Sequence, residues 1–238
     1  MLVRVYRANR SRGVHHADSF FPFSDVMTRL PKAQRREQIL VTARTLFAAR
    51  GYSGATTSEL AKAAGVTEPI LYRHFTSKKE LFIAVIDHAG QQTIEQWNRQ
   101  LRAGRDAAQR LRRLIGANPM IRSGGKGIYR VISQAMMEIE DPDILAALQR
   151  HVASLHDFVT REVAHAQEEG TVSKAFSPEI TAWTLMHLGL GYGVLAPLNL
   201  PGHAIDGRNV RVRDLVEQLM LGPRTDKRER GDGEPPPE

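Results

Sequence analysis

The chain has 238 residues, of which 42% are hydrophobic, and a formal net charge of +7 at pH 7. A chain of this length can bury a hydrophobic core without disulfides or structural metals. It contains no cysteine, which excludes disulfides, thiol nucleophiles and thiolate metal sites. The positive charge lies almost entirely in the first hundred residues. A polyanion is therefore the expected partner of this N-terminal part, with a merely solvated basic surface as the alternative.

Residues 1–30 contain five arginines and no helical stripe of apolar residues. We therefore expect a flexible N-terminal extension. Met27 lies just ahead of the first helical pattern, which favours a non-functional leader before a later start codon. A basic arm that lies along DNA is the alternative, because DNA-binding domains use such arms.

A first helix is predicted from Lys32 to Arg50, where apolar residues recur with helical spacing. They are Ile39, Leu40, Ala43, Leu46 and Phe47. Gly51 follows at the place of a helix C-cap glycine. This helix opens a domain that we expect to span residues 31–80.

The segment from residue 56 to 75 contains two helix starts separated by a glycine. Thr56 and Glu59 have the spacing of a capping box, and Thr67 caps a second helix whose first turn holds Pro69. Gly65 can adopt a positive φ, so the chain turns sharply between the two helices. This pattern predicts a helix-turn-helix, whose second helix can enter a DNA major groove. An ordinary helical corner is the alternative.

Further helix starts follow in the larger remaining part of the chain. Ser77 and Glu80 form a second capping box ahead of a long helix that reaches Leu101. Asp-Pro at 141–142 and Ser-Pro at 177–178 mark two more helix starts. No stretch alternates as a β-strand does, so we predict an all-α fold of about nine helices. A helical domain at 81–222 precedes a charged, proline-rich and disordered tail at 223–238.

The order and spacing of these residues, over about Arg35 to Phe82, resemble the DNA-binding domain of the TetR family of transcriptional regulators. The residues that carry the resemblance are Ala43, Leu46, Phe47, Gly51, Tyr52, Thr56, Glu59, Leu60, Ala61, Ala64, Gly65, Val66, Thr67, Leu71, Tyr72, His74, Phe75, Lys78 and Leu81. The resemblance implies a three-helix DNA-binding domain, a linking fourth helix, and a C-terminal helical domain for ligand binding and dimerisation.

The resemblance also implies which residues meet DNA. The exposed start of the second helix would reach base edges with Thr67, Glu68, Pro69 and Ile70, and the positions that commonly touch phosphate are Thr56, Thr57, Tyr72, His74 and Lys78. At these positions the sequence has no Arg or Lys that could donate hydrogen bonds to guanine. Three options for sequence specificity remain: a hydrogen bond from a cytosine amine to Glu68, methyl contacts from Pro69 or Ile70, or recognition of DNA shape.

Residues 180–205 contain no Asp, Glu, Lys or Arg, which raises the question of a membrane span. Interruption by glycines, threonines and Pro197 favours a buried helix instead. Gly189 and Gly193 would allow another helix to approach closely. We expect a homodimer interface formed with Leu215, Leu219 and Met220 of the last helix, with packing inside one chain as the alternative. Two DNA-binding domains then imply a palindromic operator on double-stranded DNA.

A small apolar effector is a further expectation from the resemblance. Its pocket would be lined by Met120, Tyr129, Met136, Phe158, Trp183, Met186 and Tyr192, each of which is otherwise a core residue. Binding would lower operator affinity by favouring a second conformation. A repressor released by its effector is the expected function, and an activator or a regulator without ligand remains open.

Enzyme chemistry has little support in the sequence. Glu162-x-x-His165 resembles half of a di-iron motif but lacks the second copy, and His151 and His156 do not share a helical face. We expect no metal, no cofactor, no catalytic residues and a cytoplasmic location. A helical metal-dependent enzyme and a helical module that binds membranes or acidic proteins are the competing classes.

Overall fold

The computed structural model describes residues 30–116 and 126–221, except 196, 197, 199, 204 and 206; side chains are described from residue 130 onward in the second range. In this part of the chain every regular element is helical, apart from an isolated antiparallel bridge between Ile205 and Arg211. The predicted all-α fold is confirmed. The predicted extension and tail lie outside the described residues, except for Leu30.

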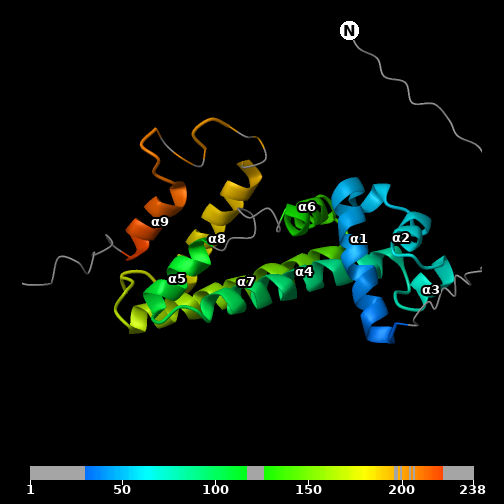
Figure 1. The fold of residues 1–238 in the computed structure, drawn as a ribbon, viewed down its shortest axis with the longest axis horizontal. Coiled ribbons are helices and arrows are strands. Elements are labelled where there is room, and N and C mark those ends of the chain that lie inside the picture. The colour runs from blue at the N-terminus through cyan, green and yellow to red at the C-terminus, as the bar shows by residue number, and fades with distance from the viewer. Residues whose placement is uncertain are drawn as a thin grey trace, which may run out of the picture. The chain divides into compact units, whose positions relative to one another are not determined.

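Nine α-helices and one 3₁₀ turn are present in the described ranges (Figure 1). They are α1 (Lys32–Gly54), α2 (Thr57–Ala63), α3 (Glu68–Tyr72), α4 (Lys78–Leu101), α5 (Ala107–Gly116), α6 (Lys126–Ala135), η2 (Met136–Glu138), α7 (Pro142–Glu168), α8 (Pro178–Leu195) and α9 (Val212–Leu221).

Several predicted helix ends have the expected local chemistry. Gly51 has φ 76° and ψ 173°, so regular helical geometry stops after Arg50. Asp141 caps α7, where its carboxylate accepts the N–H groups of residues 143 and 144. The predicted capping box at α4 is only half present. Ser77 accepts from the Glu80 N–H, but the Glu80 carboxylate bonds to Thr76 instead.

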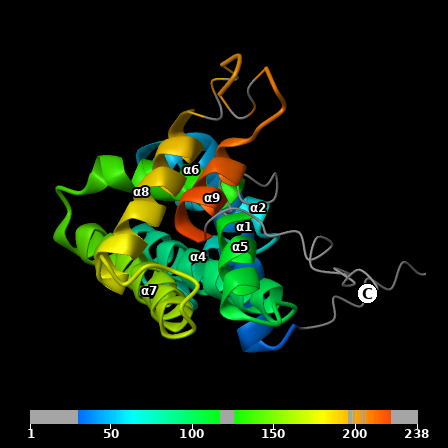
Figure 2. The same ribbon diagram turned by 90° about the vertical axis from the view of Figure 1, so that its left-hand side faces the viewer.

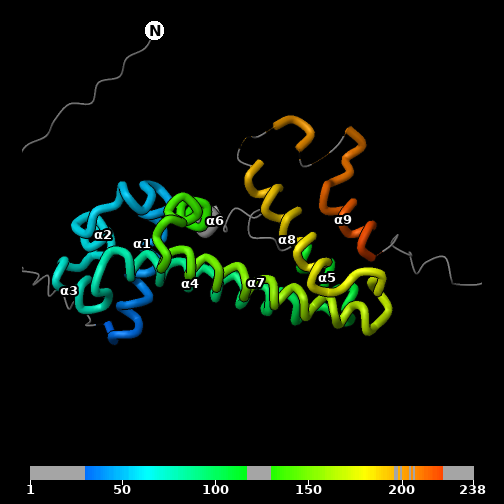
Figure 3. The backbone as a smooth tube through the Cα atoms, turned by 180° about the vertical axis from the view of Figure 1, so that it is seen from behind, coloured from blue at the N-terminus to red at the C-terminus, as the bar shows by residue number. Residues whose placement is uncertain are grey.

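Helices α4 and α7 run parallel and side by side, away from α1–α3 and toward α5 (Figures 1 and 3). Near their N-termini, Lys79 Nζ lies 3.2 Å from Asp141 and 2.7 Å from Asp143. Farther along, the rings of Trp97 and Phe158 have centroids 5.4 Å apart. The pair is therefore joined along its length, and α4 reaches from α1–α3 to the C-terminal helices.

Two hydrophobic clusters lie along this pair. The first joins α1–α3 to the start of α4 and also includes Val131, Ile132 and Ile144 from α6 and α7. The second lies among α4, α5, α7 and α8, around Trp97 and Phe158. The boundary that we expect at residues 80–81 lies within α4, and the first cluster extends across it.

Helices α8 and α9 bury few residues in the single chain. Ala182 is the one buried residue of α8, and Glu217 is the one buried residue of α9. Figure 2 shows α8 over α7 and α9 beside α5. Among the described helices, α8 included, none has the length and apolar character needed to cross a membrane.

Candidate DNA-binding surface and internal cavity

The connection between α2 and α3 is a tight helix-ending turn. Ala64 ends α2, the Gly65 N–H donates to the Lys62 carbonyl (3.1 Å), and the Val66 N–H donates to the Ala61 carbonyl (3.0 Å). These two bonds form a Schellman motif, which requires a residue with positive φ. Gly65 supplies it, with φ 65°. The turn predicted from the sequence is therefore present.

The start of α2 carries the predicted capping box. The Thr56 hydroxyl accepts the Glu59 N–H at 3.2 Å, and the Glu59 carboxylate accepts the Thr56 N–H at 3.2 Å. This bonding, together with Arg50 at 3.0 Å, lowers the pKa of Glu59. The exposed Thr56 is thus fixed in position at the first turn of α2.

Helix α3 buries one side and exposes the other. Leu71 and Phe75 are 2% and 1% exposed and pack into the first cluster, whereas Ile70 and Tyr72 are 37% and 45% exposed. Thr67 and Pro69 are exposed as well. The buried residues fix the helix, so its outer face can meet a partner.

Thr67 begins α3 without the predicted side-chain cap. Its backbone is extended (φ −84°, ψ 157°), but its hydroxyl makes no capping hydrogen bond. Glu68 instead links the two helices, because its carboxylate accepts the Thr57 hydroxyl at 3.2 Å. The Thr57 hydroxyl proton is therefore directed at Glu68, while the Thr67 hydroxyl has no capping partner.

Lys78 has a structural role that the sequence did not reveal. Its ammonium donates to the carbonyls of Tyr52 (3.0 Å) and Ala55 (3.1 Å) and lies 4.6 Å from the centre of the Tyr52 ring. Two of its three N–H groups are thereby used inside the domain. Lys78 fastens the start of α4 to the segment between α1 and α2.

His74 lies among cationic side chains. Its pKa is lowered, first by burial and then by the positive charges of Lys32, Arg73, Arg36 and Arg35. Burial and these positive charges therefore disfavour the protonated form of the ring. The three cations from the start of α1 were missed in the sequence, because only the fold brings that helix beside α3.

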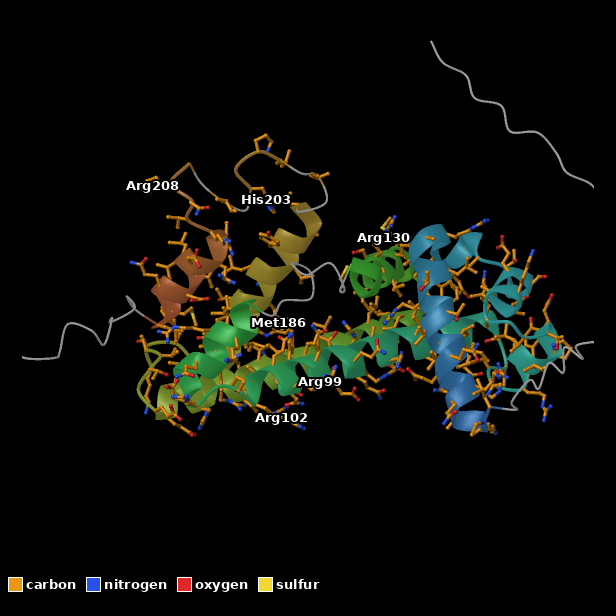
Figure 4. All side chains as sticks on the ribbon, viewed as in Figure 1. Arg99, Arg102, Arg130, Met186, His203 and Arg208 are labelled. Atoms are coloured by element: carbon orange, nitrogen blue, oxygen red, sulfur yellow. The ribbon has the colours of Figure 1, made fainter. Side chains whose placement is uncertain are left out.

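A partly open cavity of about 340 Å³ lies among α4, α5, α7, α8 and the start of α9. Three predicted effector residues line it, namely Met136, Met186 and Tyr192. Met186 is labelled in Figure 4. The walls are mostly apolar, with the remaining lining side chains contributed by Thr93, Trp97, Leu114, Ile115, Ile132, His151, Val152, Leu155, Val159, Leu185, Leu188, Leu190, Ile205, Arg211, Val212, Arg213 and Val216.

Two predicted effector residues do not line the cavity. Phe158 is 4% exposed and packs against Trp97, within the second cluster. Trp183 stacks on His156, with ring centroids 4.3 Å apart. Both therefore serve packing on other sides of their helices. Met120 lies outside the described residues, and so does the side chain of Tyr129.

The predicted dimer residues lie on different surfaces. Leu215 and Leu219 are 53% and 76% exposed. Gly189 lines the partly open cavity, and Met220 packs against the second cluster. Gly193 is half-buried.

The candidate metal residues have other partners. Glu162 forms a two-bond ion pair with Arg110, and His165 lies 3.4 Å from Glu169. Across the described ranges, no three His, Cys, Asp or Glu side chains converge to hold a metal ion.

These features define a class of protein: an all-α fold with an exposed helix-turn-helix, joined by one long helix to C-terminal helices that line a partly open cavity. Residues 39–85 match the family model described as bacterial regulatory proteins, tetR family. This match begins within α1 and ends in the first turns of α4. In this segment the chain is similar to the DNA-binding domain of TetR-family regulators.

Similar proteins were found by sequence and by structure. The HTH-type transcriptional activator FasR of Mycolicibacterium smegmatis is 42% identical over 89 residues, covering 37% of this chain and 41% of that protein. The nucleoid occlusion factor SlmA of Marinobacter nauticus is 28% identical over 151 residues, covering 63% and 75%. The crystal structure of AibR with isovaleryl coenzyme A and operator DNA shares the fold, with a TM-score of 0.56, 21% identity and coverage of 79% and 99%.

Proposed function

We propose that this protein is a regulator of transcription that binds double-stranded DNA through α3. The observation that carries the proposal is the outer face of α3, where Thr67, Pro69, Ile70 and Tyr72 are exposed over a buried Leu71. Cationic side chains surround this face and suit phosphate oxygens, while the short exposed side chains suit base edges. We also propose that the protein acts by binding rather than by catalysis, and that it acts in the cytoplasm.

Fluorescence anisotropy with labelled DNA from the region flanking the protein's own gene tests this proposal. Arg73→Gln removes an exposed cation at the end of α3. We expect weaker binding to every sequence and a salt dependence reduced by about one unit of slope. The matched control is Arg102→Gln, an exposed arginine at the far end of α4, labelled in Figure 4. Equal effects of both variants would contradict an α3 interface.

Specificity is the second part of this test. Ile70→Ala leaves the phosphate contacts intact but removes an apolar group from the outer face of α3. We expect it to change the preference among related sequences, with about 1–3 kcal/mol lost at the base pair concerned. Uniform weakening over all sequences would assign Ile70 to backbone positioning instead.

We also propose that the chain acts as a homodimer on a palindromic operator. Helix α8 is rich in apolar residues yet buries only Ala182 in one chain, which leaves a large apolar face for a second copy. The exposed large hydrophobic residues of α8 and α9 that do not line the cavity are Ile180, Val194, Leu195, Leu215 and Leu219.

Light scattering at micromolar concentration distinguishes a dimer from a monomer. Leu219→Glu places a charge on the expected interface, and we expect it to shift the mass toward the monomer. Met137→Glu is the control, because Met137 is 82% exposed but lies on η2. A monomeric wild-type protein would overturn the dimer proposal.

The partly open cavity supports the proposal of an effector that controls DNA binding. Thr93 and Trp97 line the cavity and belong to α4, the helix that Lys78 fastens to the DNA-binding domain. A ligand that prefers one placement of α4 shifts the population of DNA-binding conformations. We propose a repressor that its effector releases. Transcription in vitro tests whether the bound protein lowers or raises the amount of transcript. A repressor lowers it. An activator raises it, and that result would agree with the description of FasR as an activator.

A further inference from the structure

The charge of the cavity wall restricts what it can hold. Two arginines, Arg211 and Arg213, contribute to the lining, and no Asp or Glu side chain does so among the described residues. The other polar groups of the lining residues are those of Thr93 and His151, the indole N–H of Trp97 and the Tyr192 hydroxyl. Within the described lining, a positively charged ligand would therefore meet guanidinium groups and no carboxylate.

The two arginines differ in how their charge is balanced. Arg213 lies 3.5 Å from Asp214 and 3.6 Å from the buried Glu217, so its charge is largely compensated. The Arg211 side chain is exposed, and no carboxylate of the described chain lies within ion-pair distance of it. The Asp214 carboxylate accepts the Arg211 backbone N–H at 3.1 Å. Arg211 therefore offers its guanidinium donors to another group.

The wall formed by α4 and α7 is uncharged. His151 is 7% exposed, and burial lowers its pKa while the Ile86 carbonyl and Asp87 oppose that change. Trp97, Val152, Leu155 and Val159 continue this wall with apolar surface. A charged group would lose its hydration against this wall without gaining a counter-ion.

From this distribution we infer that the cavity binds an amphiphilic anion, with an apolar body against α4, α7 and α8 and one anionic oxygen group at Arg211. The inference rests on the proposed effector function and names the chemical class of the effector. A guanidinium recognises carboxylate and phosphate oxygens through paired, charge-assisted hydrogen bonds. The anionic group lies at the rim of the cavity, and the body fills about 340 Å³ of largely apolar space.

Isothermal titration calorimetry with DNA-free protein tests the inference. The ligands are octanoate, octyl phosphate, octanol and octylamine, each below its micelle concentration, so that chain length is constant and the head group changes. We expect either anion to bind at least about tenfold more tightly than octanol, and octylamine to bind least. The two anions distinguish a carboxylate from a phosphate. Equal affinity for octanol and both anions, or tighter binding of octylamine, would overturn the inference.

Matched variants locate the anionic group. Arg211→Gln should remove the advantage of the anions over octanol, whereas Arg130→Gln, an exposed arginine of α6 outside the lining (Figure 4), should preserve it. Arg211 is preferred to Arg213 because the Arg213 guanidinium already lies within ion-pair distance of Asp214 and Glu217. An unchanged advantage in Arg211→Gln would contradict the assignment.

A cavity-filling variant tests the location of the apolar body. Val152→Phe adds volume from α7, and we expect it to weaken all of these ligands while circular dichroism shows a retained helical fold. Undiminished binding in the folded variant would place the ligand elsewhere and overturn the inference. Operator binding is measured separately by anisotropy without ligand. Loss of DNA binding alone would therefore contradict the proposed function and leave the ligand class standing.

Discussion

At the scale of single residues, the same side chain type serves different purposes according to its neighbours. Lys78 and Lys79 are adjacent, yet one bonds to backbone carbonyls and an aromatic ring while the other pairs with Asp141 and Asp143. These hydrogen bonds to Asp143 and Asp141 raise the pKa of Lys79. Both lysines thus hold α4 in place before any contact with DNA.

Replacement of Lys78 by methionine tests its structural role, since methionine keeps an apolar stem but removes the ammonium. We expect a loss of about 2 kcal/mol in the free energy of unfolding, measured by urea denaturation. The reason is that two part-buried carbonyls lose a charged donor. Lys62→Met, at an exposed position of α2, is the control and should change stability by less than about 0.5 kcal/mol.

Burial of His151 makes stability depend on pH. Its folded-state pKa is below the ordinary value of 6.5, so the unfolded chain binds more protons below that value. We expect the free energy of unfolding to fall as the pH is lowered from about 7 toward the folded pKa. In His151→Gln this part of the pH dependence should be absent, as measured by urea denaturation at several pH values. An identical slope in both proteins would contradict the prediction.

At the scale of elements, the helix-turn-helix depends on one backbone conformation. An added Cβ at Gly65 would meet nothing within 4 Å, so space does not restrict this position. Its φ of 65° does, because residues with a Cβ rarely adopt it. The crossing of α2 and α3 is therefore set by the turn together with Leu60 and Leu71 beneath it.

Gly65→Ala should destabilise the folded protein by about 1–2 kcal/mol, because alanine is strained at positive φ. Gly65→Asn should cost less, since asparagine tolerates this conformation better. Thermal denaturation monitored by circular dichroism measures both variants. Equal stability of the glycine and alanine proteins would show that the turn relaxes to another conformation.

At the scale of the whole molecule, the proposed dimer predicts the geometry of its operator. Two copies of α3 related by twofold symmetry must meet the same side of the duplex, so half-sites lie about one helical turn apart or at a multiple of it. Insertion of about 5 base pairs between half-sites rotates one of them to the opposite side. We expect anisotropy to show affinity reduced to that of a single half-site. Insertion of about 10 base pairs is the control for length, because it restores the rotational phase.

The sequence determined the local features of this protein, because helix caps, positive-φ glycines and apolar spacing depend on neighbours within a few residues. The capping box at Thr56, the turn at Gly65 and the all-α fold all follow from such short-range patterns. The family resemblance came from the same stretch. These features could be predicted without knowledge of which helices meet.

Only the tertiary structure decided what each side chain faces. Lys78 turned inward because the carbonyls of Tyr52 and Ala55 lie beside it, and Phe158 and Trp183 were separated from the cavity by the rotation of α7 and α8. Arg211 lines the cavity although it is distant in sequence from the residues of α4 and α7 that form the opposite wall. Helical periodicity in the sequence predicts which face of a helix is apolar, but not which other element packs against that face. That packing depends on contacts between residues far apart in the chain.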